Sequence, residues 1–444
     1  MILSNWANYP KIDCNVDCSL DLNSIYDAVE HCNSLITRGN GLSYSDAAFN
    51  QNKTLILQKM NRILDFDEEK GIITAEAGIT LEEILKVTVP KHWIIPVLPG
   101  TAKVTLGGAV ASDIHGKNHH KKGCISNFIK EFSIIVSDND PLVVKSNDKT
   151  PEGLFNATCG GMGLTGIILR VTLQLERIET SYISQTTIKT CSLEETLHYL
   201  KESNKEEMSV AWVNMGSTKH LGSAIIYTGH YAKTEELHNV TDSCSYTPSR
   251  KLNIPFTPAK SLVSYPTIKA FDYLYYKHHK PDTKCVPLDK FFFPLDGIKN
   301  WNRLYGSAGI QQYQFVIPES EADILPALFR YLCIEERAIS PLAVMKLCGE
   351  HCGRKGSLSF PIKGISLAMD FPCTPHLMNV LNHVDELLLD HGGRIYLAKD
   401  GGIMERSTFM QMYKEQFEEF METKIHYDPH CRYTSLLSQR LMGF

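Results

Sequence analysis

Three glycine-rich segments in the first half of the chain have the composition of a phosphate-binding backbone. They are Thr37–Ala47, Pro96–Thr101 with its continuation Thr105–Gly116, and Gly161–Gly166. Glycine lets the backbone approach a ligand closely, and free N–H groups in such turns can cradle a pyrophosphate without a lysine. Neither of the first two is a Walker A loop. Three glycine-rich segments that are separated along the chain indicate a long ligand such as a dinucleotide.

The third segment, Gly161-Met-Gly-Leu-Thr-Gly166, matches the pattern G-x-G-x-x-G. In a Rossmann site this pattern follows a strand and opens a helix. Here Gly153–Ala157 is predicted to be helical, and the residues after Gly166 are predicted to form a strand. We therefore reject a Rossmann site. Two interpretations remain: a tight turn from helix to strand, or a turn whose backbone lies against a different kind of nucleotide site.

The cysteines do not indicate a metal centre. The chain has 13 scattered cysteines, mostly in apolar surroundings, which is typical of reduced thiols in a cytoplasmic protein. The segment Cys348-Gly-Glu-His-Cys352 holds three potential ligands, but its spacing is not that of a zinc site and no second Cys/His pair matches it. We expect no metal and interpret this segment as a loop with incidental thiols.

Length and charge narrow the class of protein. The 444 residues exceed one compact core, so we expect two domains. The net charge of −5 argues against a nucleic-acid binder. The N-terminus lacks the charged and apolar regions of a signal peptide, and no apolar run approaches the roughly 20 residues of a membrane span. We expect a soluble or peripheral protein.

The pattern of short apolar runs predicts an α+β fold. Its strands are expected at Thr54–Met60, Gly71–Ala77, Trp93–Leu98, Ile167–Leu175, Ser209–Asn214, Ser223–Thr228, Gln311–Ile317 and Gly364–Phe371. A capping box at Thr80–Glu83 predicts a helix through Lys86. Further helices are expected at Ala322–Cys333, at His376–Leu389 and from Ser407 onward. From about Thr187 to Gly392 these elements indicate an antiparallel sheet with helices.

Several longer motifs occur together in this chain. They are Gly41–Asp46 (GLSYSD), Pro96–Thr101 (PVLPGT), Asp113–His120 (DIHGKNHH), Trp301–Gly306, Gln312–Pro318, Asp370–Pro372 and Ala398–Asp400. In these motifs the chain resembles the decaprenylphosphoryl-β-D-ribose 2-oxidases of the vanillyl-alcohol-oxidase superfamily, over nearly its whole length. The resemblance implies a PCMH-type FAD-binding domain at 1–178, completed by 393–444, and an α+β substrate domain on an antiparallel sheet at 179–392.

The resemblance also assigns residues to FAD. The implied cofactor contacts are Thr37, Arg38, Gly39, Asn40, Gly41, Leu42, Ser43, Tyr44, Ser45, Asp46, Ala47, Gly100, Thr101, Thr105, Leu106, Gly107, Gly108, Ser112, Asp113, Ile114, His115, Gly166 and Tyr396. Many relatives in the superfamily attach flavin to a histidine in an Arg-Gly-x-Gly-His loop. Because Leu42 stands at that position and has no nucleophilic nitrogen, we expect non-covalent FAD.

The resemblance places the substrate pocket at Tyr44, His115, Gln312, Gln314, Lys346 and Lys399. We expect Lys399 to take up the hydroxyl proton of a secondary alcohol, because burial can lower a lysine pKa by several units. Tyr44 would relay the proton or orient the hydroxyl, and His115 is the second candidate for the base. The alternatives are a surface lysine at a strand end and a histidine packed in a turn.

Three further features bear on the substrate. The basic run His119–Lys122 is either a solvated loop or a phosphate-attracting patch. The aromatic and basic stretch Tyr265–Lys284 favours a lipid-linked substrate, although it could equally be a surface loop. Ala368 stands where mycobacterial members of the family carry a pocket cysteine, so we expect no covalent capture of thiol-reactive inhibitors.

The implied reaction is oxidation of the 2-hydroxyl of a polyprenylphosphoryl-β-D-ribofuranose. The ketone would then be reduced by a separate NAD(P)H-dependent short-chain reductase, which completes an epimerisation to the arabinose form for the cell wall. We expect a cytoplasmic location with peripheral contact at the inner face of the membrane. The rival hypotheses are a sugar or aldonolactone oxidase acting on a free soluble substrate, and a non-catalytic scaffold for a reductase.

Overall fold

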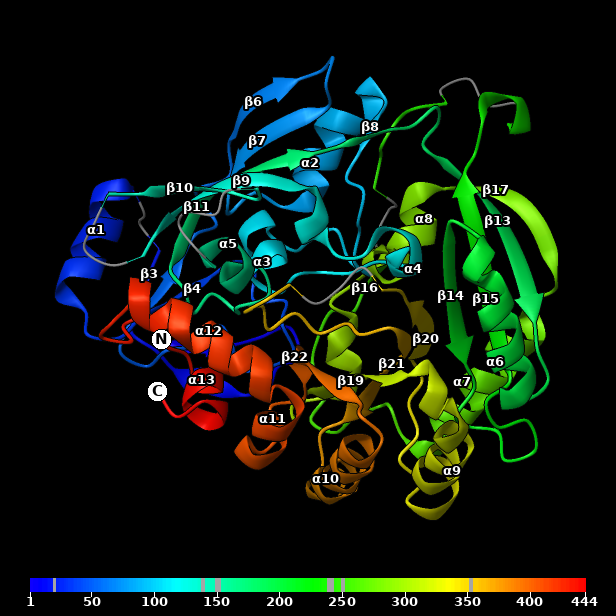
Figure 1. Cartoon of the computed structure of the whole chain (residues 1–444). Coiled ribbons are helices and arrows are strands. Elements are labelled where there is room, and N and C mark those ends of the chain that lie inside the picture. Colours follow the sequence, from blue (N-terminus) through cyan, green and yellow to red (C-terminus); the bar gives the residue numbers. More distant parts are fainter. Residues whose placement is uncertain (19–20, 137–139, 148–152, 238–242, 249–251, 351–353) are drawn as a thin grey trace.

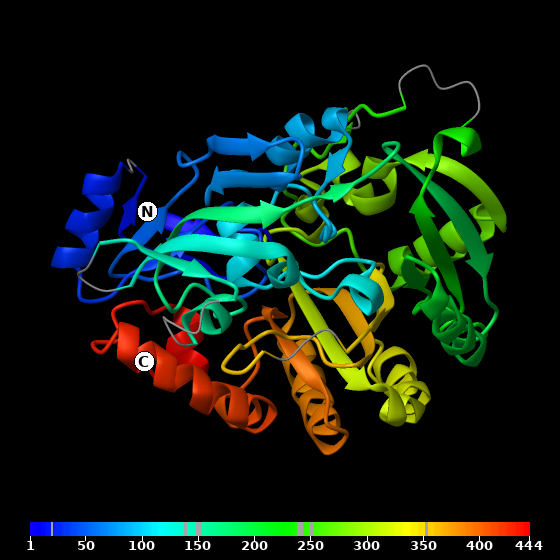
Figure 2. The ribbon, with the colours of Figure 1, turned by 45° about the horizontal axis from the view of Figure 1, so that its top comes forward.

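The computed structural model describes the whole chain except residues 19–20, 137–139, 148–152, 238–242, 249–251 and 351–353. Its helices and strands are arranged around two main sheets, one built from the first part of the chain and one from the later part (Figures 1 and 2). The predicted α+β class with an antiparallel sheet is confirmed.

The first main sheet has five antiparallel strands. In spatial order they are β10 (Leu142–Lys145), β9 (Ile129–Ile135), β11 (Ile167–Gln174), β7 (Ile72–Glu76) and β6 (Ile63–Asp67). Apolar residues of β7, β9 and β11 are buried together with those of helices α2 (Leu81–Thr88) and α3 (Leu106–Ala111) in one core. This core fixes the start of α3, where the second glycine-rich segment turns.

A small parallel sheet lies next to it. Its strands are, in order, β3 (Val16–Asp17), β5 (Thr54–Ile56) and β4 (Ile36–Arg38). Strand β4 ends directly before the first glycine loop. The chain returns to this region at its C-terminal end, because Leu35 N–H donates to the Arg432 carbonyl and Thr434 N–H donates to the Leu35 carbonyl.

The second main sheet has eight strands and is antiparallel throughout. The order is β17 (Asp282–Pro287), β13 (Tyr182–Lys189), β15 (Ala224–Tyr231), β14 (Met208–Val213), β20 (Ala343–Cys348), β21 (Gly364–Pro372), β19 (Ile310–Pro318) and β22 (Arg394–Asp400). Strand β19 is buried over nearly its whole length. Apolar side chains of α9 (Leu325–Arg330) and α10 (Pro375–Asp390) share its core, so β19 to β22 form a rigid base for side chains.

Most predicted elements match the structure. The capping box at Thr80 is present, with Thr80 Oγ1 accepting from Glu83 N–H and the Glu83 carboxylate accepting from Thr80 N–H. The turn at Gly161–Gly166 joins α5 (Leu154–Thr158) to β11, as the helix-to-strand prediction requires.

Other predicted elements differ. The strand expected at Trp93–Leu98 is only β8 (Trp93–Ile94), because Pro96 has no N–H to donate to a ladder. The helix expected from Ser407 is two helices, α11 (Arg406–Met412) and α12 (Lys414–Tyr427). One helix is expected at Ala322–Cys333, but only α9 within it is an α-helix; a 3₁₀ turn precedes α9 and a π turn follows it.

The division into domains stays a prediction. Strand β22, which falls in the predicted C-terminal segment, hydrogen-bonds to β19 in the eight-stranded sheet. The helices that follow return to the first part of the chain: α12 packs against α5, and α13 (Leu436–Leu441) begins where Leu436 N–H donates to the Phe49 carbonyl. The C-terminal segment therefore contacts both halves of the molecule.

Candidate active site

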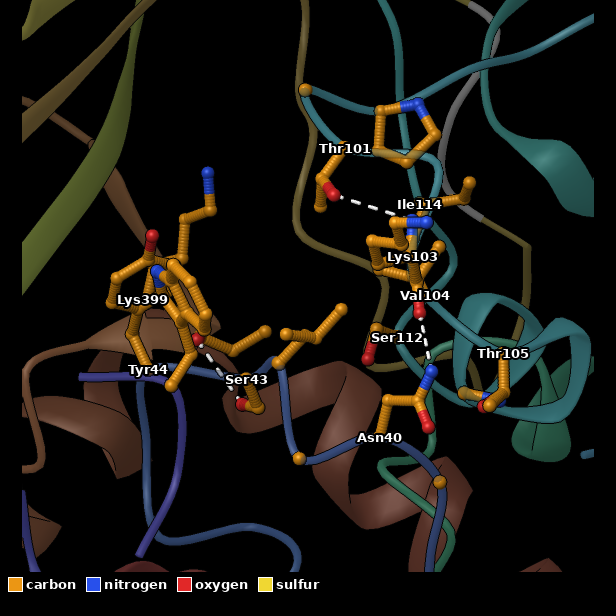
Figure 3. A pocket seen from close by; sticks show the side chains of 18 of the residues that line it. Asn40, Ser43, Tyr44, Thr101, Lys103, Val104, Thr105, Ser112, Ile114 and Lys399 are labelled. Carbon is orange, nitrogen blue, oxygen red and sulfur yellow. Dashed lines mark hydrogen bonds between the residues drawn. The ribbon is translucent and has the colours of Figure 1, made fainter. Parts of the chain in front are cut away.

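A single cavity of about 940 Å³ runs between the glycine-rich segments and the β19–β22 face of the large sheet. This volume is near the upper end of the usual range for small-molecule sites. Figure 3 shows Tyr44 and Lys399 at one end, and Asn40, Thr101 and Thr105 at the other. We call these the polar end and the glycine end.

At the glycine end, the loop after β4 exposes backbone donors. Within the described chain, no protein acceptor is found for the N–H groups of residues 39–43. Gly41 has φ +62°, a conformation that glycine adopts without strain, and its carbonyl accepts from Trp6 N–H. Successive free N–H groups of this kind bind phosphate.

The second glycine segment is tied to the first and to a distant aspartate. Asn40 Nδ2 donates to the Lys103 carbonyl at 2.7 Å. Thr101 Oγ1 and Ala102 N–H donate to the Asp296 carboxylate at 2.7 and 3.0 Å. Thr105 caps α3 by accepting from Gly108 N–H. These bonds hold the turn around Gly100 and Thr101 against the cavity.

The third glycine segment also reaches the cavity, through Met162, Gly163 and Gly166. Gly166 has φ +153°, and a Cβ there would lie 2.3 Å from the Ile135 carbonyl oxygen, so only glycine fits. The second interpretation of the G-x-G-x-x-G pattern, a turn against a nucleotide site of another kind, therefore has structural support. Tyr396, on β22, donates its hydroxyl to the Ser112 carbonyl at 2.8 Å.

Not every residue predicted to contact the cofactor lines the cavity. Ser45, Asp46, Leu106 and Asp113 do not. Asp46 accepts a two-pronged bond from Arg440, Asp113 accepts from Ser126 and Ser359, and Leu106 is in the core. These residues contact other parts of the protein and not the cavity, while the other predicted residues line the cavity.

At the polar end, Lys399 lies on β22 and Asp370 on β21. Burial lowers the pKa of Lys399 to about 8; the nearby Asp370 carboxylate opposes this shift and Lys346 adds to it. Burial raises the pKa of Asp370 to about 6, while a hydrogen bond from Gln312 and the charge of Lys399 oppose the rise. A large share of Lys399 is therefore neutral amine near pH 8 and can accept a proton.

Tyr44 is placed beside Lys399 by the backbone (Figure 3). Tyr44 N–H and Ser43 Oγ both donate to the Ala398 carbonyl, at 2.9 and 3.2 Å, so the glycine loop is joined to β22 directly before Lys399. Burial and the nearby Asp370 hold the pKa of Tyr44 well above its ordinary value. Its hydroxyl therefore stays protonated and can donate a hydrogen bond.

His115 is buried at the same end of the cavity. Its Nε2 lies 3.1 Å from Gln314 Nε2, which also donates to Ser366 Oγ. Burial and the nearby Lys346, among other cations, hold the pKa of His115 well below its ordinary value. Among the described residues, no group bonds to His115 Nδ1, so a neutral imidazole offers this atom to a bound molecule.

Four more basic residues lie near this end. Lys346 Nζ donates to the Gly116 carbonyl at 2.9 Å. Lys117 lies 4.6 Å from the centre of the Phe291 ring, and burial lowers its pKa to about 7. His119 and His120 are buried in the short helix α4 (His119–Lys122), so the solvated-loop prediction is wrong for both, because their rings are needed for packing and for hydrogen bonds.

Some cavity residues were missed from the sequence. They are Trp6, Gln58, Lys103, Lys117, Val210, Asp296, Ile298, Trp301, Val344, Ser366 and Asp370. Lys117, Trp301 and Asp370 had a signal, since each belongs to one of the quoted motifs, but Asp296 had none. In the described part of the chain no group of His, Cys, Asp or Glu residues is arranged to hold a metal, and His351 and Cys352 lie outside the described residues.

The comparisons with known proteins agree with this geometry. The family model described as an FAD binding domain matches residues 21–144. The decaprenylphosphoryl-beta-D-ribose oxidase of Mycolicibacterium smegmatis is 34% identical over 93% of this chain and 90% of its own length. A D-lactate dehydrogenase of Anaerostipes hadrus is 28% identical over 29% of this chain and 28% of its own, and a mouse L-gulonolactone oxidase is 32% identical over 33% of each.

The fold and the site define an FAD-dependent oxidoreductase. The chain belongs to the decaprenylphosphoryl-β-D-ribose oxidase family. The residues present fit FAD, since the glycine end offers unpaired N–H groups to a pyrophosphate and the polar end offers buried atoms without protein partners, among them His115 Nδ1 and Gln312 Oε1. Leu42 lines the cavity at the position where a linking histidine would stand.

Proposed function

We propose that this chain oxidises the 2-hydroxyl of a polyprenylphosphoryl-β-D-ribofuranose to the 2-keto sugar, the first half of a 2-epimerisation to the arabinose form. The observation that carries the chemistry is Lys399, which is half-buried in the lining of the cavity beside Tyr44 and has its pKa lowered to about 8. The observation that favours this substrate is the similarity to the mycobacterial oxidase over almost the whole of both chains.

The proposed mechanism divides two tasks. FAD held at the glycine end would supply the acceptor for the hydride from C2 of the sugar. The chain removes the hydroxyl proton: neutral Lys399 amine takes it as the C–O bond gains double-bond character, so that a ketone and a lysine ammonium result. Asp370 then stabilises the new positive charge. Tyr44 orients the hydroxyl or relays its proton.

Other polar side chains are proposed to hold the sugar. Gln312 and Gln314 line the cavity from β19, and each has a buried side-chain oxygen without a protein partner among the described residues. Lys346, Lys117 and the neutral His115 lie nearby. Together they offer donors, acceptors and positive charge to a sugar that carries a phosphate.

The rival substrate is a free lactone or soluble sugar. The L-gulonolactone oxidase match favours it, but that match spans only a third of either chain. The presence of Tyr44, His115 and Lys399 together in the lining of one cavity argues against a non-catalytic scaffold. A separate NAD(P)H-dependent short-chain reductase would reduce the ketone from the other face.

The test is to identify the product. The FAD-loaded protein is mixed with a short-chain polyprenylphosphoryl-ribofuranose, and the product is trapped with borodeuteride. We expect one deuterium at C2 and a mixture of ribo and arabino sugars. Deuterium at another carbon, or none while a free lactone is oxidised, would contradict the proposal.

A further inference from the structure

The stretch from β16 (Leu252–Asn253) to α7 (Tyr265–His278) exposes apolar side chains at unusual density. Of the fifteen large hydrophobic side chains exposed in the described part of the chain, six lie in this stretch. They are Leu252, Phe256, Leu262, Phe271, Tyr273 and Leu274, with exposed fractions of 41 to 74%. Clustered exposed apolar groups mark a surface that meets an apolar partner.

Helix α7 is anchored by one face and open on the other. Its buried residues are Ile268 and Asp272, and the Asp272 carboxylate accepts from Gly216 N–H at 2.7 Å. Tyr276 donates its hydroxyl to the Thr190 carbonyl, also at 2.7 Å. Tyr273 and Leu274 lie on the open side and are more than 60% exposed. The helix is therefore fixed in place while it presents these two side chains outward.

The stretch carries an excess of positive charge. Between Leu252 and Pro281, Asp272 is the only acidic residue, and it is buried. The lysines Lys260, Lys269, Lys277 and Lys280 are all exposed. The whole chain carries a net charge of −5, so this excess of positive charge is local. Lysines next to exposed aromatic and aliphatic side chains match the interface of an anionic bilayer.

The stretch is joined to the wall of the cavity. Strand β16 pairs with β18 (Ile298–Lys299), whose residues line the cavity together with Asn300 and Trp301. Arg303 Nη1 donates to the Ile254 and Pro255 carbonyls at 2.9 and 2.8 Å. The exposed apolar residues therefore continue from the segment that closes one side of the active site.

We propose that this stretch, Leu252–Lys280, docks the enzyme on an anionic lipid bilayer and so brings the active site to the membrane surface. This proposal rests on the proposed function, because docking serves a substrate whose polyprenyl tail would stay in the bilayer while its sugar enters the cavity. No helix in the described residues is both long and apolar enough to cross a membrane; α7 would lie in the plane of the interface.

Vesicle sedimentation with the FAD-loaded protein tests the proposal without reference to activity. We expect binding to vesicles of phosphatidylcholine mixed with phosphatidylglycerol and little binding to phosphatidylcholine alone. The variants Tyr273→Glu/Leu274→Glu and Lys269→Glu/Lys277→Glu should each weaken binding about tenfold or more. A third variant, Leu252→Glu/Phe256→Glu, tests the part of the stretch nearest the cavity and should also weaken it.

Matched controls change exposed residues of the same kinds elsewhere. Met378→Glu/Ile425→Glu alters two exposed apolar side chains, and Lys130→Glu/Lys145→Glu alters two exposed lysines; both should bind vesicles like the wild type. Flavin content should be unchanged in every variant. Equal losses in variants and controls, no binding by the wild type, or self-association through this surface instead of vesicle binding would overturn the proposal. Vesicle binding without sugar oxidation would refute the proposed function alone.

Discussion

The two ends of the cavity present different kinds of group to a ligand. The glycine end presents backbone N–H groups of residues 39–43, in turns that need glycine at positions such as Gly41 and Gly166. The polar end presents titratable side chains on the strands of the large sheet, and burial shifts the pKa values of Lys399 and Asp370.

This difference predicts a division of labour. Backbone donors held in a fixed turn can bind a cofactor tightly without taking part in proton transfer. A buried lysine contributes little to cofactor affinity, but its lowered pKa allows it to accept a proton. Changes at the glycine end should therefore affect FAD retention, and changes at the polar end should affect the rate of flavin reduction.

The largest expected effect is at Lys399. Lys399→Ala should keep its FAD, while flavin reduction by substrate slows by roughly two to four orders of magnitude, the usual scale for loss of a general base. Single-turnover flavin bleaching at saturating substrate measures it. A variant that reduces its flavin at nearly the wild-type rate would remove lysine from the mechanism and make His115 the first candidate.

Tyr44→Phe should slow flavin reduction less, by roughly tenfold, if the tyrosine orients the hydroxyl or relays its proton. The double variant with Lys399→Ala should show less than the product of the single effects, because groups that act as one unit are not additive. The same bleaching experiment measures the rate of flavin reduction in the single and the double variant. Fully multiplicative effects would show that the two side chains act independently.

Gly41→Ala tests the glycine end. A left-handed alanine costs about 1–2 kcal/mol, and its Cβ would lie 2.0 Å from Arg38 Nη2. We expect FAD affinity to fall about tenfold, while the FAD-saturated variant reduces its flavin at nearly the wild-type rate. Gly297→Ala is the control, since no atom lies within 4 Å of a Cβ there. Equal FAD affinity in both variants would contradict the assignment of FAD binding to the glycine end.

The pH dependence follows from Lys399. Its amine must be neutral to accept a proton, and its pKa is lowered to about 8. The rate of flavin reduction should therefore fall about tenfold per pH unit below 8 and level off above it. Asp370→Asn removes a charge that raises this pKa, so its profile should shift to lower pH. A flat profile between pH 6 and about 9 would contradict the assignment.

The smallest expected effect concerns Ala368, which lines the cavity on β21. A nitroaromatic inhibitor that requires a pocket thiol should leave the mass of the wild-type protein unchanged. Ala368→Cys should gain an adduct visible in the intact mass. An adduct on a pocket residue of the wild type would show that another side chain replaces the thiol.

The glycine end could largely be predicted from the sequence, because its function depends on short segments whose glycines and turns are local. Leu106 and Asp113 lie within such a segment yet do not line the cavity. Leu106, at the start of α3, packs into the core, and Asp113, just after the end of α3, accepts hydrogen bonds from Ser126 and Ser359. No sequence pattern marked Asp296, because its hydrogen-bond partner Thr101 lies 195 positions away in the chain. His119 and His120 likewise bond to residues far along the chain, Gly349 and Glu206.

The central claim is that a phosphorylated lipid sugar, and not a free lactone, delivers hydride in this cavity. Anaerobic mixing of the FAD-loaded enzyme with a short-chain polyprenylphosphoryl-ribofuranose or with L-gulono-1,4-lactone tests it directly through the visible absorbance of the flavin. We expect rapid bleaching by the lipid-linked sugar, slow or no bleaching by the lactone, and loss of the rapid phase in Lys399→Ala. Rapid bleaching by the lactone with none by the lipid-linked sugar would contradict it.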